Sequence, residues 1–334
     1  MPVYSVTYKG KIILEDSPLG LETNIGDFSR NMSWKEQKTN QIDKIYTQDR
    51  IKKSKIHYQA NELVCSFQNA DKREIEIVFR VSNNDIAFRY VIPRKDGPGS
   101  CVVERETTGF DFPAKTTAFL TPQSDAMIGW MRTKPSYEEE YKADAPVSTP
   151  SQYGHGYTFP CLFCIGDDGW ALISETGVDS RYCASHLSEA GEDGRFTIAF
   201  PLSEENNGNG TVAPGLALPA ATPWRTITVG ENLKPIVETT VIWDETIFID
   251  GYPGKYCVLA RRHGDKWYVA GVNAQKGPLK LKIHLPMFEK DDKLLLYNDD
   301  EKRNAYTREV YLNKNNEITL TIQSEGGILL VGNP

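Results

Sequence analysis

The stretch Glu74–Ile92, EIEIVFRVSNNDIAFRYVI, decides the fold class of this chain. Apolar residues alternate with others in its first part and share one face, namely Ile75, Ile77, Phe79 and Val81. The turn Asn83-Asn84-Asp85 follows, and Ile86–Ile92 then forms a second run. Two alternating runs joined by Asn and Asp predict two antiparallel β-strands in a hairpin.

The same pattern recurs on both sides of this hairpin. With few helical segments between them, so many strands predict an all-β chain whose residues 1–240 form a large antiparallel β-super-sandwich. No alternation of strands with long helices appears, so neither a doubly wound sheet nor a TIM barrel is expected. Short helices are expected only at Tyr137–Lys142 and Asn40–Lys55. The further predicted strands are Val3–Tyr8, Lys11–Leu14, Glu62–Phe67, Trp170–Ile173, Phe196–Phe200 and Thr226–Val229.

A second domain, a small C-terminal β-sandwich, is predicted for residues 241–334. Its first hairpin joins Lys255–Arg261 to Lys266–Asn273 through the turn residues Arg262–Asp265. Six or seven strands in roughly 90 residues suffice for such a domain. The remaining predicted strands are Pro278–Leu285, Leu294–Tyr297, Glu317–Gln323 and Gly327–Val331.

The composition excludes some classes of function. The chain has 334 residues, of which 40% are hydrophobic and 25% charged, and a formal net charge of −7. These proportions are ordinary for a globular protein. The negative balance argues against a nucleic-acid partner, which would require a basic surface. It is compatible with a neutral ligand such as a sugar, although it does not select one.

Six cysteines are too few for a disulfide scaffold, but Cys161 and Cys164 form a C-x-x-C. Such a pair is typical of redox and metal sites. The surrounding PCLFCIG is strand-like, however, and an odd spacing along a strand places two side chains on opposite faces. A second C-x-x-C that would complete a zinc site is missing. We therefore predict two structural cysteines.

The N-terminus carries no recognisable targeting segment. Met1-Pro2 leads directly into VYSVTYKG, without the basic and apolar regions of a signal peptide. No apolar run approaches the ~20 residues of a transmembrane helix, so no membrane span is expected.

Few residues form a recognisable catalytic pattern. GxSxG, P-loop, HExxH and GxGxxG motifs are all absent from the sequence. Cys183 and His186 have the residue types of a nucleophilic dyad, but their strand-like context favours a packed or hydrogen-bonded role. His155 lies between Gly154 and Gly156, which would let a loop approach a ligand closely.

Aromatic residues gather around this GHG segment and around the long acidic loop Lys134–Pro150. They predict either the border of a saccharide site or an interface with another domain, and we favour the interface. His155, Tyr153 and Tyr157 are the substrate-binding candidates; the other aromatic residues are Trp130, Tyr137 and Tyr141.

Several long segments resemble a known family. Residues 3–25, VYSVTYKGKIILEDSPLGLETNI, resemble the opening of the N-terminal domain of glycoside hydrolase family 97, the bacterial α-glucosidases and α-galactosidases. Similarity to that domain continues in NNDIAFRY (83–90), in WALISETGVDSRYCASHL (170–187) and in TPWRTITVG (222–230). WDETIFIDGYPGKYCVLARRHGDKW (243–267) and the GGILLV near the end resemble its C-terminal domain. The resemblance thus covers nearly the whole chain.

The resemblance implies a calcium-dependent, retaining or inverting α-glycosidase of the periplasm, with a catalytic barrel between the two β domains. Here Thr239–Trp243 joins the two parts directly and leaves no room for a barrel. The general acid and the base or nucleophile of the family come from that barrel, so we assign no catalytic residue. The N-terminal domain of the family supplies one acidic calcium ligand, and Glu175 of ISETG matches it.

The residues themselves give Glu175 a similar place. It follows the apolar strand WALIS and precedes Gly177, so its carboxylate is expected at a strand end. Calcium requires six to eight oxygens, which one carboxylate cannot provide, so weak or absent calcium binding is expected. Asp179 and the acidic run Glu138–Glu140 are weaker candidates for a ligand contact.

Three functions follow from this reading. The first is a non-catalytic remnant of a family 97 glycosidase, which hydrolyses α-glucosides or α-galactosides poorly or not at all. The second is a carbohydrate-binding module for an oligosaccharide. The third is a mutarotase-like epimerase, in which His155 and Glu175 would act together. A missing barrel would also expose an apolar interface, so self-association is expected.

Overall fold

The computed structural model confirms an all-β protein. It describes residues 1–47, 55–95, 97–124, 139–202, 212–238 and 245–332. The strands pair in antiparallel fashion in both its N-terminal and its C-terminal parts. The chain divides into two compact units. Met1–Asp43 and Gln59–Glu231 form the first, and Lys44–Tyr58 and Asn232–Pro334 form the second.

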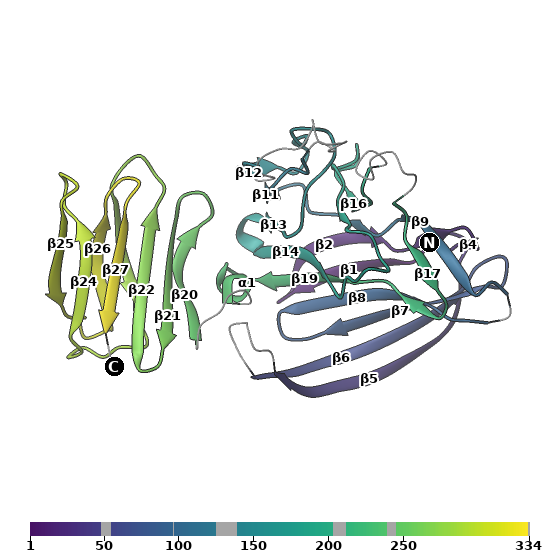
Figure 1. Ribbon diagram of the computed structural model, residues 1–334, viewed down its shortest axis with the longest axis horizontal. Helices are drawn as coiled ribbons and strands as arrows, with labels where there is room; N and C mark the ends of the chain where they lie inside the picture. The colour runs from purple at the N-terminus through teal and green to yellow at the C-terminus, as the bar shows by residue number, and fades with distance from the viewer. Residues whose placement is uncertain (48–54, 96, 125–138, 203–211, 239–244, 333–334) are drawn as a thin grey trace. The chain divides into compact units, whose positions relative to one another are not determined.

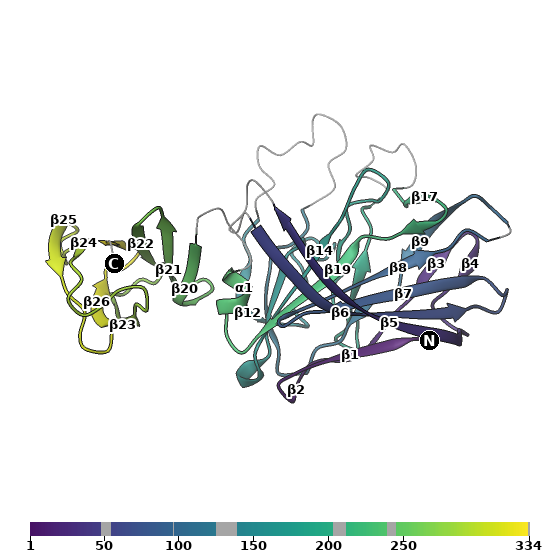
Figure 2. The same cartoon turned by 90° about the horizontal axis from the view of Figure 1, so that it is seen from below.

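The first unit is built around one large sheet (Figures 1 and 2), of which only the strand ends formed by residues 44–47 and 55–58 belong to the second unit. Its strand order is β12-β11-β13-β14-β19-β8-β7-β6-β5, and β18 also pairs with β8. The strands are β5 (Ser33–Thr47), β6 (Lys55–Gln68), β7 (Glu74–Val81), β8 (Asp85–Ile92), β11 (Thr117–Leu120), β12 (Lys142–Pro146), β13 (Cys161–Cys164), β14 (Trp170–Thr176), β18 (Ala220–Ala221) and β19 (Trp224–Gly230).

Three smaller sheets contribute the facing layer of the sandwich. They are β1-β2, β10-β16-β15 and β17-β9-β3-β4. Buried side chains from both layers form one core, with Phe88, Tyr90, Phe110 and Phe163 among the largest. The strands are β1 (Val3–Tyr8), β2 (Lys11–Pro18), β3 (Leu21–Thr23), β4 (Gly26–Asp27), β9 (Ser100–Glu106), β10 (Gly109–Phe110), β15 (His186–Leu187), β16 (Phe196–Ala199) and β17 (Gly215–Ala217).

The second unit is a small sandwich with its own core. A six-stranded sheet, β20-β21-β22-β27-β24-β25, accompanies the two-stranded sheet β23-β26. Trp267, Phe288 and Leu330 belong to the core of this unit. Its strands are β20 (Glu245–Tyr252), β21 (Tyr256–His263), β22 (Lys266–Asn273), β23 (Leu279–His284), β24 (Leu294–Asp299), β25 (Ala305–Val310), β26 (Glu317–Ile322) and β27 (Gly327–Gly332).

Both short helices were predicted in the wrong places. Residues 40–47 continue β5, and Lys142 begins β12, while residues 48–54 and 137–138 lie outside the described ranges. The helical turns are instead η2 (Gly166–Asp168) and α1 (Lys234–Glu238). Within the described residues, no helix has the length and hydrophobicity that crossing a bilayer requires.

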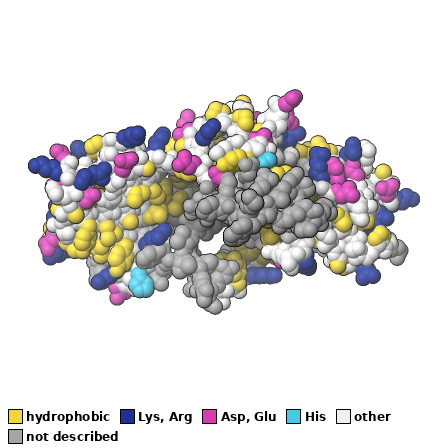
Figure 3. Space-filling model, turned by 45° about the horizontal axis from the view of Figure 1, so that its top comes forward, with side chains coloured by type: hydrophobic (Ala, Val, Ile, Leu, Met, Phe, Trp, Pro, Cys, Tyr) yellow, Lys and Arg dark blue, Asp and Glu magenta, His cyan; other side chains and the backbone are white. Residues whose placement is uncertain are grey.

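Charged side chains of both signs are interspersed over the face in Figure 3, with hydrophobic side chains between them.

Candidate functional site

Glu175 lies at the end of β14, where the sequence placed it. The register pairs Glu175 with Arg225 of β19, and Arg225 in turn with Phe88 of β8. Directly paired residues on neighbouring strands point to the same face of a sheet. Because Phe88 belongs to the core, Glu175 and Arg225 also point inward, and Arg225 is completely buried.

Two carboxylates bracket the guanidinium of Arg225. Glu106, at the end of β9, accepts a bidentate pair, from Nε to Oε1 at 2.9 Å and from Nη2 to Oε2 at 2.6 Å. On the other side, Arg225 Nη1 donates to Glu175 Oε2 and lies 2.8 Å from Ser185 Oγ. Ser185 Oγ donates to the same Glu175 oxygen at 2.6 Å. The Glu106 side chain is 0% exposed and that of Glu175 is 14% exposed.

A second layer of hydroxyl groups completes what we call the Arg225 cluster, namely Arg225, Glu106, Glu175, Ser185, Tyr182, Thr108 and Tyr90. Tyr182 and Thr108 donate to the two oxygens of Glu106 at 3.1 and 2.9 Å. Tyr90 lies 2.7 Å from Thr108, and its oxygen accepts from the amide of Gly20. Each buried polar group of the cluster therefore has a partner, which low-dielectric surroundings demand.

Burial and charge set the protonation states in this cluster. Burial works against the charge of Arg225, but Glu106 more than compensates and raises the pKa of the guanidinium. Burial, and then the negative charge of Glu106, raise the pKa values of Tyr182 and Tyr90 far above that of free tyrosine. The guanidinium is thus charged, and both phenols are neutral donors.

These residues provide one oxygen toward a metal, and not a complete calcium site. Arg225 and Ser185 occupy Glu175 Oε2, and among the described residues none donates to Oε1. In that part of the chain no group of three or more His, Cys, Asp or Glu side chains is arranged to hold a metal ion. Since calcium takes six to eight oxygens, the residues present do not fit it without ligands from elsewhere.

The GHG segment approaches its own backbone. Gly156 has φ of +85°, and a Cβ there would lie 2.2 Å from the carbonyl oxygen of Leu187. Tyr157 and Leu187 exchange backbone hydrogen bonds of 2.7 and 2.9 Å next to it. The need for glycine at position 156 therefore comes from strand packing.

The three predicted substrate-binding residues have different surroundings. Tyr157 is buried in the core and donates to the Thr149 carbonyl at 2.7 Å. The Tyr153 hydroxyl is half-buried and donates to Glu139 at 3.1 Å. The His155 carbonyl lies 2.9 Å from Nε2 of His186. Sugar contact by these residues stays a prediction.

Neighbouring residues connect His155 with Glu175. Ser185 bonds to Glu175, and the next residue, His186, approaches the backbone of His155. His186 thus has a hydrogen-bonded, buried role, as predicted. Burial raises the pKa of Cys183 to about 12, which is opposite to what a nucleophilic thiol requires.

The remaining candidates are occupied or structural. Asp179 forms a bidentate pair with Arg181 on the surface. Glu139 accepts from Ser124 at 2.8 Å, Glu140 borders a small cavity, and Glu138 lies outside the described residues, as do Trp130 and Tyr137. The exposure alternates along β13, so Cys161 is buried and Cys164 is not, and both are free thiols, which confirms the prediction for this pair.

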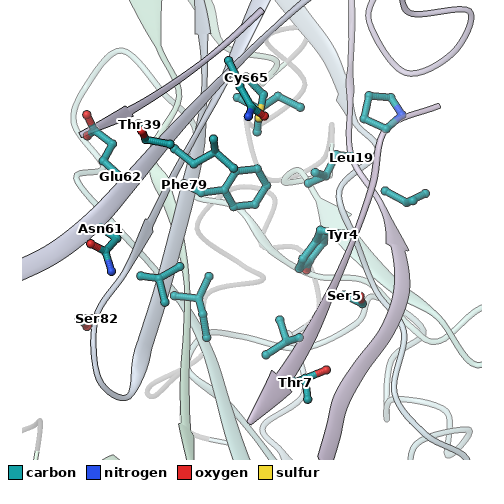
Figure 4. Close-up of a pocket in the computed structure, with 18 of the residues that line it drawn as sticks. Tyr4, Ser5, Thr7, Leu19, Thr39, Asn61, Glu62, Cys65, Phe79 and Ser82 are labelled. Carbon is teal, nitrogen blue, oxygen red and sulfur yellow. The ribbon is translucent and has the colours of Figure 1, made fainter. Parts of the chain in front are cut away.

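A larger cavity of about 1050 Å³ lies between β1 and the inner face of β5, β6 and β7. Figure 4 shows Tyr4 and Phe79 on its facing walls, and their ring centroids are 6.4 Å apart. Leu63 and Cys65 add to the apolar walls of the cavity. Polar side chains line its side toward β5, among them Gln37, Thr39, Gln41 and Asn61. We call this cavity the β1 groove.

Sequence reasoning missed Arg225 and Glu106, although one signal was present. In WRTITVG, strand alternation places Arg225 on the same face as Ile227 and Val229. An arginine on an apolar strand face is a buried cation that needs a buried anion. Nothing local in the sequence identifies that anion as Glu106.

Comparisons with known proteins agree with this architecture. Residues 1–244 match the family model described as glycosyl-hydrolase 97 N-terminal. Residues 242–331 match the model described as glycosyl-hydrolase 97 C-terminal, oligomerisation. Together the two models cover nearly the whole chain.

Two curated relatives are α-galactosidases. A probable retaining alpha-galactosidase of Streptomyces bingchenggensis is 28% identical over 238 residues, which are 70% of this chain and 33% of that protein. A retaining alpha-galactosidase of Bacteroides thetaiotaomicron is 50% identical over 42 residues, 13% of this chain and 6% of that protein. The chain matches at most about a third of the length of these relatives.

Solved structures extend the similarity. The crystal structure of a beta-arabinopyranosidase has a TM-score of 0.93 and 33% identity, over 99% of this chain and 96% of that chain. A family 97 enzyme of Pseudoalteromonas sp. strain K8 in complex with panose has a TM-score of 0.83 at 12% identity, over the same shares of the two chains. The second likeness concerns the fold alone. The chain belongs to glycoside hydrolase family 97 and carries the N-terminal and C-terminal domains of that family.

Proposed function

We propose that this chain is a non-catalytic part of a family 97 glycosidase and hydrolyses no glycoside by itself. The observation that carries the proposal is the Arg225 cluster. Glycoside hydrolysis uses two carboxyl groups that flank the scissile bond, about 5 Å apart for retention and about 6.5–9.5 Å apart for inversion. Glu106 and Glu175 are brought together here, but both bind the same guanidinium.

The burial of Glu106 supports this conclusion. Its side chain is fully buried, and four donor groups from Arg225, Tyr182 and Thr108 occupy its two oxygens. A general acid or nucleophile must reach the substrate within hydrogen-bond distance. Glu106 has no such access, and Glu175 alone cannot perform a reaction that needs two carboxyl groups.

For the parent enzyme we propose a galacto-configured substrate. The relatives with 28–50% identity are named α-galactosidases and a β-arabinopyranosidase. β-L-Arabinopyranose has the ring stereochemistry of α-D-galactose and lacks only the hydroxymethyl group. The enzyme crystallised with panose, a glucose trisaccharide, is only 12% identical. Galactose and arabinopyranose therefore form one substrate class, and the relatives with higher identity favour this class over glucose.

Hydrolysis assays test the proposed absence of catalysis. The purified chain is incubated with p-nitrophenyl α-D-galactopyranoside, β-L-arabinopyranoside and α-D-glucopyranoside, with and without calcium. We expect no p-nitrophenol release above the buffer rate. Steady release that a chelator abolishes would show that this chain assembles a working site.

Saccharide binding without hydrolysis is a second candidate function, which the β1 groove favours. The β1 groove has aromatic rings on its walls and amide side chains along one side. Such groups bind neutral sugars through ring faces and hydrogen bonds. Calorimetric titration with galacto-oligosaccharides and maltooligosaccharides tests it. Saturable heat that Phe79→Ala removes supports binding in the groove, and no heat with either series refutes it.

Three further expectations are also proposals. The parent enzyme would act in the periplasm, this chain would bind calcium weakly or not at all, and it would self-associate. The match of residues 242–331 to a domain described with oligomerisation supports self-association. Sedimentation equilibrium measures the oligomeric state, and a monomer at all concentrations would contradict the third expectation.

A further inference from the structure

A second arginine, Arg89, lies on the opposite face of the same sheet. Arg225 pairs with Phe88, and both point into the core. Their chain neighbours, Trp224 and Arg89, therefore point outward by strand alternation. This outer face is separate from the Arg225 cluster. The two sites have no residue in common, although Trp224 is next to Arg225 in β19.

Trp224 packs against two guanidinium groups. The Cζ atom of Arg89 lies 4.4 Å from the indole centroid, and that of Arg80 lies 4.7 Å from it. Cation–π contacts of this kind hold a guanidinium in place while its edge stays available for hydrogen bonds. The tryptophan thus orients both arginines.

Arg80 has an anionic partner, and Arg89 has none among the described residues. Arg80 Nε donates to Glu62 Oε2 at 2.8 Å, and Asn40 donates to Oε1 of the same carboxylate at 3.1 Å. Both oxygens of Glu62 are therefore engaged. The Nε atom of Arg89 is buried without a hydrogen-bond partner, and the described residues form no ion pair with this side chain. Buried donors are usually paired, so the unpaired Nε of Arg89 is an unusual feature.

The local charges do not balance. Two guanidinium groups face one carboxylate, which leaves an excess of one positive charge on a chain of net charge −7. Partial burial, and then the charge of Arg80, lower the pKa of Arg89, while Glu62 opposes this change. An arginine stays protonated at neutral pH even so, and the excess charge persists.

We propose that Arg89 and Arg80, held on Trp224, form a binding site for a single carboxylate group. The edge of a guanidinium between its two Nη atoms matches a planar carboxylate in a bidentate pair, and the described residues form no hydrogen bond with these atoms of Arg89. One negative charge neutralises the excess of one, whereas a sulfate or phosphate dianion would overcompensate it. The carboxylate belongs either to an acidic sugar, such as a uronic acid, or to an acidic side chain of another polypeptide.

The site does not depend on the proposed function. Its residues lie on the outer face and include no member of the Arg225 cluster. A chain that hydrolyses galactosides would leave this site possible, and a chain without carboxylate binding would leave the absence of hydrolysis unaffected. The two proposals therefore fail separately.

Calorimetric titration of the whole chain tests the site. The probes are sodium galacturonate, its neutral match galactose, N-acetyl-aspartate N-methylamide, and sodium sulfate. We expect at least one of the two carboxylates to bind in a 1:1 ratio and more tightly than galactose and sulfate. Binding of galacturonate alone assigns the site to an acidic sugar, and binding of the aspartate derivative alone assigns it to a polypeptide. Equal binding of both shows that the carboxylate itself is recognised.

Variants locate the binding. Arg89→Gln should weaken it at least tenfold, and Arg89→Lys should weaken it less, because a lysine keeps the charge but loses the bidentate edge. Arg308→Gln is the matched control, since this exposed arginine lies over Tyr306 in the second unit. Unchanged melting temperatures establish that the variants are folded. Affinity that Arg89→Gln and Arg89→Lys leave unaltered, equal heat from galactose, or no heat from either carboxylate would overturn the proposal.

Discussion

Arg225 and Arg89 occupy neighbouring strands of one sheet and point to opposite faces, yet they have very different partners. Arg225 is buried between Glu106 and Glu175 and receives further support from Ser185. Arg89 is half-buried on Trp224, and the nearby carboxylate of Glu62 bonds to Arg80. Every nitrogen of the inner guanidinium has a hydrogen-bond partner, whereas Nε of the outer one has none among the described residues.

The difference follows from what each face meets. Core-facing residues of β8 and β19 lie against the smaller sheets, so β9 can bring Glu106 to Arg225 from 119 positions away in the sequence. On the outer face, Arg80 receives its carboxylate partner from Glu62 of β6, an adjacent strand of the same sheet. The inner arginine therefore draws partners from two sheets, whereas the Arg80–Glu62 pair lies within one sheet.

Replacing Arg225 should have the largest effect on stability. Arg225→Met removes the only cation of the cluster and leaves Glu106 buried without a counter-charge. Breaking a buried ion pair in this way costs about 3–5 kcal/mol. Urea unfolding at pH 7, followed by circular dichroism, measures the change, and a loss below 1 kcal/mol would contradict the assigned structural role.

The two carboxylates of the cluster should differ from each other. Glu106→Gln weakens a bidentate pair that is fully buried, with an expected loss of about 3 kcal/mol. Glu175→Gln affects a partly exposed carboxylate that has one free oxygen, with an expected loss of about 1 kcal/mol. The same unfolding assay compares them. An equal or reversed order would mean that Glu175, not Glu106, anchors the arginine.

Alkaline pH tests the burial of one tyrosine hydroxyl. Burial, and then the charge of Glu189, raise the pKa of Tyr157 to about 12, against 10.0 in its ordinary state. The unfolded chain therefore loses this proton first, so the contribution is fully present below pH 10 and is lost as the pH rises from 10 toward 12. The free energy of unfolding should fall more steeply in the wild type than in Tyr157→Phe over this window. Parallel curves would contradict the shift.

Replacing Arg89 should have the smallest effect. Arg89→Met leaves no described residue without its hydrogen-bond partner, and it removes an uncompensated positive charge. We expect a change within about 1 kcal/mol in either direction. Differential scanning calorimetry of Arg89→Met and Arg225→Met side by side shows the contrast. A loss from Arg89→Met as large as that from Arg225→Met would show that Arg89 has a structural partner.

The sequence predicted strands well where one face of the strand is buried. Glu74–Val81 and Lys266–Asn273 alternate clearly, and they are β7 and β22 with the same bounds. β5 was read partly as a helix because nearly all of its residues are exposed, so no buried face imposes a period of two. Val81 was expected inside with Ile75 and Ile77, but it lies exposed at the end of β7.

The site was predictable only in its local part. Glu175 follows an apolar strand and precedes a glycine, which is enough to place it at a strand end. Its attachment to Arg225, and that of Arg225 to Glu106, depend on strand order and on the packing of one sheet against another. A single sequence does not contain that pairing information.

Calcium titration tests most directly whether Glu175 is only one ligand of a site completed elsewhere. The whole chain, freed of metal by a chelator and dialysis, is titrated with calcium chloride in a calorimeter, beside Glu175→Gln. We predict no saturable heat up to millimolar calcium in either protein. Stoichiometric 1:1 binding that Glu175→Gln abolishes would show instead that these domains form a calcium site on their own.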